Sequence, residues 1–198
     1  MVQSRQFNKI FCIGMNKTGT SSIHAAFLEL DLKSLHHGHA ECSTLKEHLA
    51  SAQSLANMIL DNHKSGKKLL KHINEYDAYS DIGPVINKFD ILDHQYPNSK
   101  FIYTDRDTEE WIDSRRRHVL RNLANEDKGL YKSDFSQIEE EKWRKRKSIH
   151  LNKVKKHFEN RPESLLFIRI TEGEGFEKLC PFLGFECINK PFPKKNIV

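Results

Sequence analysis

The segment IFCIGMNKTGTSS, residues 10–22, decides the fold expected for this chain. An apolar run over residues 7–13 ends at Gly14. A turn with Lys17 and Gly19 follows, and an apolar helical repeat begins two or three residues later. This order predicts a strand, a tight loop and the start of a helix. Backbone N–H groups converge in such a loop and the helix dipole adds partial positive charge, so the segment predicts a binding site for phosphate or sulfate.

The side chains of this loop suit the same kind of ligand. Lys17 brings a full positive charge, and the neighbouring hydroxyl groups bring hydrogen-bond donors. An ordinary Gly/Thr turn with a surface lysine is the alternative when the loop is taken alone. The anion-binding hypothesis assigns the contacts to Asn16, Lys17, Thr18, Gly19, Thr20, Ser21 and Ser22.

The position of the lysine distinguishes between kinds of anion-binding loop. In the nucleoside-triphosphatase loop G-x-x-x-x-G-K-[ST], the lysine follows the second glycine. Here Gly14 and Gly19 keep that spacing, but Thr20 occupies the lysine position. The sequence KTGTSS at residues 17–22 instead resembles the 5′-phosphosulfate loop of the sulfotransferases that use 3′-phosphoadenosine-5′-phosphosulfate as donor.

Composition and charge are those of one folded domain. Hydrophobic residues make up 37% of the 198 residues and charged ones 30%, which leaves enough apolar content for a core. We therefore expect residues 1–198 to form a single domain. The net charge of +5 suits an anionic ligand. Much of it falls in residues 115–156, where a solvated helical face is the first interpretation; no nucleic-acid-binding motif is present, so no nucleic-acid partner is expected.

Targeting signals and cysteine spacing predict a cytoplasmic protein. The N-terminal residues show no signal-peptide pattern, and no apolar stretch approaches the roughly 20 residues that a membrane helix needs. The four cysteines lack zinc-site spacing, so we expect reduced thiols and no structural metal. They are Cys12, Cys42, Cys180 and Cys187.

Two further predicted strands end in titratable side chains. A short strand over residues 32–35 is followed by His36 and His37, and an extended stretch over residues 77–83 contains Asp81 near its end. Ligands of open α/β sheets gather beyond the carboxyl ends of the strands, where these groups are expected. An exposed polar turn is the alternative for the histidines, and helix capping is the alternative for Asp81.

A strand predicted over residues 100–105 leads directly into a second candidate anion site. Arg106 follows the strand, and Ser114 lies eight residues further on, about two helical turns. A guanidinium fork and a hydroxyl suit a phosphate monoester, although an arginine at a helix start also commonly forms a surface salt bridge. The text SDIGP followed by YPNSKFIYTDRD resembles a subgroup of small sulfotransferases, and the Arg and Ser spacing resembles their 3′-phosphate site.

The remaining patterns complete the expected secondary structure. A helix is predicted over residues 84–96, and capping-box patterns at residues 136–139 and 171–174 predict the starts of two more. The apolar run at residues 165–170 predicts a strand buried on both faces. The C-terminal text ITEGEGFEKLCPFLGFE and NKPFPKKN again resembles the small-sulfotransferase subgroup.

Together these elements predict an α/β fold of three layers. Its centre is a parallel five-stranded sheet with helices on both faces, similar to P-loop nucleotide kinases. The resemblance implies that the donor lies across the carboxyl edge of the sheet. Lys17 would contact its 5′-phosphate and bridging oxygen, and Arg106 and Ser114 would hold its 3′-phosphate. No metal is implied, because the donor has no γ-phosphate that needs magnesium.

The same resemblance implies transfer of a sulfuryl group to a hydroxyl or amine, with adenosine 3′,5′-bisphosphate as product. The acceptor class stays open between a small molecule, a glycan and a lipid. Asp81 is the first candidate for the base and His37 or His36 the second. Two other functions remain as alternatives: a P-loop kinase-like phosphotransferase, and a non-catalytic nucleotide-binding protein.

Overall fold

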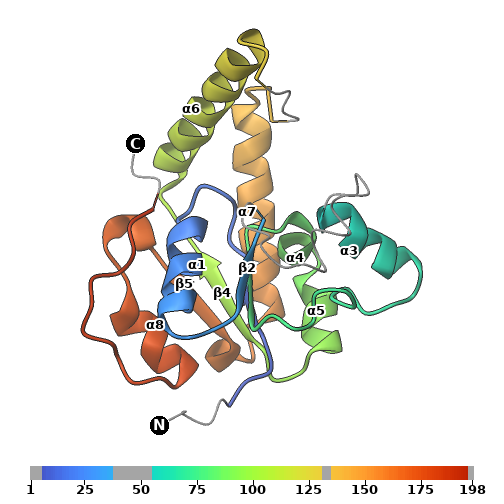
Figure 1. The fold of residues 1–198 in the computed structure, drawn as a ribbon, viewed down its shortest axis with the longest axis vertical. Helices are drawn as coiled ribbons and strands as arrows, with labels where there is room; N and C mark the ends of the chain where they lie inside the picture. Colours follow the sequence, from blue (N-terminus) through green and yellow to red (C-terminus); the bar gives the residue numbers. More distant parts are fainter. Residues whose placement is uncertain (1–5, 38–54, 131–134, 196–198) are drawn as a thin grey trace. The chain divides into compact units, whose positions relative to one another are not determined.

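The computed structural model describes residues 6–37, 55–130 and 135–195 (Figure 1). The chain divides into two compact units. The first comprises residues 1–105 and 158–198, and the second comprises residues 106–157. The prediction of one domain over the whole chain stays a prediction, and each unit is described separately below.

A parallel sheet forms the centre of the first unit. Within the described residues it has five strands in the order β2-β3-β1-β4-β5, and every neighbouring pair is parallel. The predicted α/β fold with a parallel five-stranded sheet is therefore confirmed. The strands are β1 (Ile10–Cys12), β2 (Ser34–His36), β3 (Ala78–Ser80), β4 (Lys100–Thr104) and β5 (Leu165–Ile168).

Side chains that alternate along β1 show that both faces of the sheet are covered. Ile10 and Cys12 belong to an apolar cluster with Phe27 of α1 (Thr20–Glu29) and Leu179 of α8 (Phe176–Leu183). Strand residues alternate between faces, so the intervening Phe11 points to the other side of the sheet. The sheet is thus the middle of three layers.

Aromatic rings fill the face of the sheet on which Phe11 lies. The Phe11 ring lies 5.6 Å from Tyr79 of β3 and 6.0 Å from Tyr96, between ring centroids. On β4, Phe101 lies 4.8 Å from Phe158. These aromatic side chains are at most 4% exposed, and their burial is a large part of the hydrophobic stabilisation of this unit. The other described helices of this unit are α3 (Leu55–Lys64), α4 (Gly83–Asn87) and α5 (Phe89–Gln95).

The second unit consists of two helices that pack against each other, α6 (Thr108–Asp127) and α7 (Glu140–His157). Arg115 is buried between them, with its guanidinium carbon 4.9 Å from the ring centre of Trp111, 4.4 Å from Phe135 and 4.5 Å from Trp143. Burial lowers the pKa of Arg115 to about 10, so the side chain stays charged at neutral pH. Aromatic faces stabilise such a desolvated cation.

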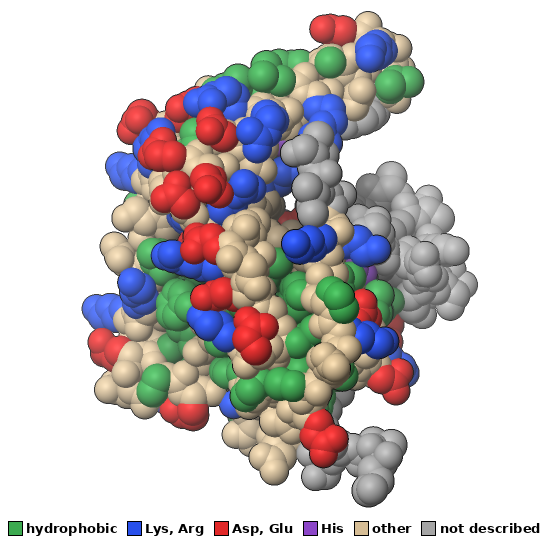
Figure 2. Space-filling view, turned by 90° about the vertical axis from the view of Figure 1, so that its left-hand side faces the viewer, with side chains coloured by type: hydrophobic (Ala, Val, Ile, Leu, Met, Phe, Trp, Pro, Cys, Tyr) green, Lys and Arg blue, Asp and Glu red, His purple; other side chains and the backbone are tan. Residues whose placement is uncertain are grey.

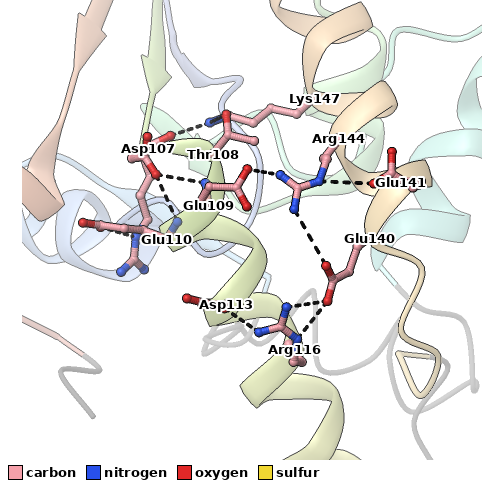
Figure 3. A network of polar contacts seen from close by, with 11 residues as sticks. Asp107, Thr108, Glu109, Glu110, Asp113, Arg116, Glu140, Glu141, Arg144 and Lys147 are labelled. Carbon is pink, nitrogen blue, oxygen red and sulfur yellow. Dashed lines mark hydrogen bonds and ion pairs between the residues drawn. The ribbon is translucent and has the colours of Figure 1, made fainter.

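Charged side chains on the outer surface of α6 and α7 form a network of ion pairs (Figure 3). Arg116 contacts Asp113 and Glu140, each at 2.5 Å, and Arg144 contacts Glu109. On the face of the molecule shown in Figure 2, basic and acidic side chains are interspersed. Exposed pairs of this kind contribute at most about 1 kcal/mol each.

Several local predictions were wrong. The helix expected over residues 84–96 is interrupted at Lys88, which separates α4 from α5. Neither capping box forms, because α7 begins at Glu140 and α8 begins after Gly175. Strand β5 lies at the edge of the sheet, so Phe167 is 37% exposed instead of buried.

The three cysteines that lie in the described residues are free thiols, as predicted. Cys12 in β1 and Cys180 in α8 are buried free thiols, and Cys187 is an exposed free thiol. Burial raises the pKa of the Cys12 thiol far above its usual range, so this group is unreactive at neutral pH. Cys42 lies outside the described residues.

Candidate functional site

The loop between β1 and α1 is fixed by a close approach of two strands. A Cβ atom on Gly14 would lie 2.2 Å from the backbone oxygen of Thr104 in β4. No side chain fits in that space, because real Cβ contacts are never so short. Gly14 therefore lets β1 pass directly into the loop while β4 stays in register beside it.

The loop then turns so that helix α1 starts without a side-chain cap. Lys17 has a φ of 67° and Gly19 a φ of 98°, both in the left-handed region. Gly19 is the N-cap of α1, and no side chain hydrogen-bonds to the cap. The first N–H groups of an α-helix have no partner within the helix, so a loop of this form suits an anion.

Two of the hydroxyls predicted to bind the anion form hydrogen bonds within the protein instead. Thr18 is 1% exposed; its hydroxyl donates to the Met15 carbonyl at 2.5 Å and lies 2.7 Å from the Thr104 hydroxyl. Ser22 is buried, and its Oγ accepts a hydrogen bond of 3.1 Å from the backbone N–H of Lys195. These side chains hold the loop and the C-terminal segment in place.

The other predicted loop residues are less enclosed, with one exception. Asn16, Lys17, Gly19 and Ser21 are partly exposed, whereas Thr20 is buried at the start of α1. Asn16 and Lys17 thus combine an amide and an ammonium group with access to solvent.

Asp81 lies directly after β3, with a φ of 56°. Burial raises its pKa to about 6, and the charges of His37 and Lys17 oppose part of that rise. These two charges therefore act on the Asp81 carboxyl, which links the loop lysine to the ends of β2 and β3. Helix capping is not its role, because α4 has Ile82 as its N-cap and no side-chain cap.

His36, more than His37, is the histidine that contacts Asp81. Its Nε2 lies 3.7 Å from Asp81 Oδ2 and 3.5 Å from Ser21 Oγ, and the side chain is only 7% exposed. The β2 and β3 register pairs His36 with Ser80, which brings its side chain next to the following residue, Asp81. His37 is exposed.

His24 of α1 is a further member of this cluster, which the sequence did not single out as a site residue. Its Nδ1 lies 2.8 Å from Ser34 Oγ, and its ring centre is 5.3 Å from that of His36. The only signal in the sequence was its place one helical turn after the loop. A single histidine at such a place does not reveal a second histidine beside it.

The two residues predicted to hold a 3′-phosphate lie in the second unit. Arg106 is its first residue, and its Nε contacts Glu110 Oε2 at 3.3 Å. Ser114 lies in α6 and is partly exposed. Asp107, which sequence analysis did not single out, is the N-cap of α6, and its side chain accepts hydrogen bonds from the N–H groups of Glu109 and Glu110.

The titration of Asp81 gives a prediction for stability. An acid whose pKa is higher in the folded than in the unfolded chain binds more protons when folded, so the free energy of unfolding falls as pH rises between the two pKa values. For Asp81 these are 3.8 and about 6. Urea denaturation from pH 4 to pH 7 should therefore show that Asp81→Asn gains stability relative to the wild type as pH rises.

Asp31→Asn is the matched control for that measurement. Asp31 is exposed and has a φ of 58°, so both substitutions place asparagine in the same backbone conformation. We expect the Asp31→Asn profile to run parallel to that of the wild type. A parallel profile for Asp81→Asn as well would contradict a raised pKa at that position.

The described residues also bear on metal binding and on membrane crossing. In the ranges that the structure describes, no group of three or more His, Cys, Asp or Glu side chains is arranged to hold a metal ion. None of the helices in those ranges is long and apolar enough to cross a membrane.

Comparison with known proteins gives two matches. Residues 9–135 and 125–197 match the family model described as a sulfotransferase domain. The chain is also similar to "Ava biosynthesis cluster protein M" of Aspergillus versicolor, with 25% identity over 209 residues. That alignment covers 93% of this chain and 79% of the relative. The family match includes the loop, Asp81 and Arg106 within its bounds.

Proposed function

Because the chain belongs to the sulfotransferase domain family, we propose that it transfers a sulfuryl group from 3′-phosphoadenosine-5′-phosphosulfate to a hydroxyl or amine of an acceptor. The family membership gives a sulfotransferase-like function, and the donor and the residue roles are parts of the proposal. The acceptor is proposed only by class, as a small molecule, a glycan or a lipid.

The observation that carries the proposal is the loop between β1 and α1. It combines an uncapped helix N-terminus with Lys17, and Gly14 has no space for a side chain. Backbone N–H groups at such a helix start bind phosphate oxygens, and the lysine adds a full charge. The residues present therefore fit the phosphosulfate end of the donor.

Each polar side chain of the site is proposed to have a separate role in binding or transfer. When bound, the donor supplies an activated sulfuryl group, and its transfer leaves negative charge on a phosphate oxygen. Lys17 is proposed to neutralise that charge, and the first N–H groups of α1 to bind the 5′-phosphate. Arg106 and Ser114 are proposed to hold the 3′-phosphate.

Asp81 is proposed to accept the proton of the attacking acceptor hydroxyl. A carboxyl with a pKa of about 6 is a stronger base than an ordinary aspartate and is still mostly ionised at pH 7. His36, 3.7 Å from the carboxyl, orients it and can share the proton. His37 is the second candidate base, because its imidazole, when neutral, can accept a proton and the residue directly follows β2, the strand that pairs with β3.

The nucleotide that the chain binds distinguishes a sulfotransferase from a kinase-like phosphotransferase. We expect adenosine 3′,5′-bisphosphate without magnesium to raise the melting temperature, because a ligand that binds only the folded state stabilises it. We expect ATP with magnesium to give a smaller shift, because Thr20 stands where the triphosphatase lysine belongs. Thermal shift assays with both ligands measure the difference; stabilisation by ATP with magnesium alone would contradict the proposal.

Transfer itself is tested with radiolabelled donor and a panel of hydroxyl and amine acceptors. The expected result is a labelled product that forms without added metal. If the bisphosphate binds but no acceptor of any class becomes labelled, the chain is a nucleotide-binding protein instead of an enzyme.

A further inference from the structure

Lys147 of α7 is buried, with 5% of its surface exposed. Lysine is almost never fully buried without a partner, because removing an ammonium group from water is costly. Neighbouring lysines and arginines of the same helix, such as Lys145 and Arg146, are exposed. Lys147 is therefore not part of the solvated basic helical face that the sequence predicts for this segment.

The ammonium group of Lys147 is directed to the start of α6. It donates a hydrogen bond to the backbone carbonyl of Arg106 and lies 3.3 Å from the Thr108 hydroxyl. It also lies 5.6 Å from the ring centre of Trp111. Figure 3 shows the Lys147 side chain reaching from α7 to the turn that contains Asp107 and Thr108.

The side chain of Arg106 is also held, by residues at the start of α6. The Asp107 carboxylate accepts hydrogen bonds from the N–H groups of Glu109, at 2.9 Å, and Glu110, at 3.1 Å. Glu110 in turn contacts Arg106 Nε at 3.3 Å. The backbone of Arg106 is thus tied to α7 through Lys147, and its side chain is tied to α6. Its terminal guanidinium nitrogens carry four more N–H donors.

The exposed ion pairs between α6 and α7 do not position the backbone of Arg106. Arg144 of α7 contacts Glu109 of α6, whose side chain is 68% exposed, and within α7 it contacts Glu140 at 3.8 Å. Water and salt screen such contacts. The hydrogen bond from the Lys147 side chain is partly buried and fixes a backbone atom of Arg106 itself, so water and salt screen it less.

We propose that Lys147 is a positioning residue that gives the protein its preference for a nucleotide with a 3′-phosphate. This inference rests on the proposed function, in which Arg106 binds that phosphate. A guanidinium that is already oriented loses little conformational freedom when a phosphate binds, so the affinity depends on how firmly its backbone is held. Lys147 does not itself contact the nucleotide.

The experiment compares the affinities for adenosine 3′,5′-bisphosphate and adenosine 5′-phosphate by calorimetry. The ratio of the two affinities isolates the contribution of the 3′-phosphate. Lys147→Met removes the charge and the donors but keeps most of the side-chain volume. We expect it to lower the ratio by about tenfold, the scale of one charge-assisted hydrogen bond, with unchanged affinity for the monophosphate.

Two variants complete the design. Lys147→Arg keeps donors and charge and should restore most of the ratio. Lys145→Met is the matched control, because it removes an exposed lysine from the same helix and should leave the ratio unchanged. Equal losses of affinity for both nucleotides in Lys147→Met would overturn the inference, since they indicate a general structural role.

Arg106→Ala separates this inference from the function on which it rests. If Arg106→Ala lowers the ratio and Lys147→Met leaves it unchanged, the role of Lys147 is wrong and the 3′-phosphate site stands. If Arg106→Ala leaves the ratio unchanged, the 3′-phosphate site itself is wrong.

Discussion

Lys17→Ala is expected to lower the turnover number for sulfuryl transfer at least about 100-fold, because a preorganised charge that stabilises a transition state contributes a few kcal/mol. Lys17 lies in the loop that leads into the uncapped start of α1, where the proposed function places the departing phosphate and its negative charge. Alanine keeps the Cβ, so the positive φ of 67° adds no new strain relative to lysine. The measurement is the initial rate at saturating donor and acceptor.

Lys33→Ala is the control for that variant. Lys33 is exposed and precedes β2, so its side chain lies toward the amino ends of the strands, away from the loop. It should keep the wild-type rate. A Lys17→Ala enzyme that is folded and retains more than about a tenth of the wild-type turnover would show that Lys17 does not stabilise the transition state.

Gly14→Ala is expected to have the largest effect on folding. The added Cβ would meet the Thr104 backbone oxygen at 2.2 Å and the Thr104 hydroxyl at 2.3 Å, and Thr104 is fully buried. Relief requires β4 to move away from β1, which breaks the hydrogen bond of 2.8 Å from the Ile13 N–H to the Ile102 carbonyl. We expect a loss of about 3 kcal/mol or more in the free energy of unfolding, or no soluble protein.

Gly83→Ala shows whether that loss is specific to the strand contact. Gly83 begins α4, and a Cβ there meets nothing within 4 Å. Alanine also favours a helix over glycine, so the change should stabilise the protein slightly or leave it unaltered, by less than about 1 kcal/mol. Urea denaturation of both variants gives the comparison; equal stabilities would contradict the steric account of Gly14.

The strands and the loop could be predicted because their signals are local. The strand predicted over residues 100–105 corresponds to β4, and the apolar run at residues 7–13 contains β1. The predicted run is longer than β1 because Phe7, Lys9 and Ile13 are buried without belonging to the strand. Lys9 Nζ donates to the carbonyls of Asn74, at 2.6 Å, and Tyr76, at 2.7 Å. Burial and strand pairing are therefore different properties, and the sequence shows only the first.

The contact between His36 and Asp81 could not be predicted because it depends on long-range register. The β2 and β3 strands are separated by more than 40 residues, and a shift of one residue would direct His36 to the other face of the sheet. The capping box predicted for α8 does not form, for a local reason. At α8, Glu177 accepts a hydrogen bond of 2.7 Å from the N–H of Gly175, so a different residue pair occupies the helix start.

A crystal structure with adenosine 3′,5′-bisphosphate is the decisive measurement, because Lys17 and Arg106 belong to different compact units and are proposed to bind one nucleotide. We expect the Lys17 ammonium to contact the 5′-phosphate and the Arg106 guanidinium to contact the 3′-phosphate of the same molecule. A bound nucleotide that either side chain cannot reach would contradict this expectation.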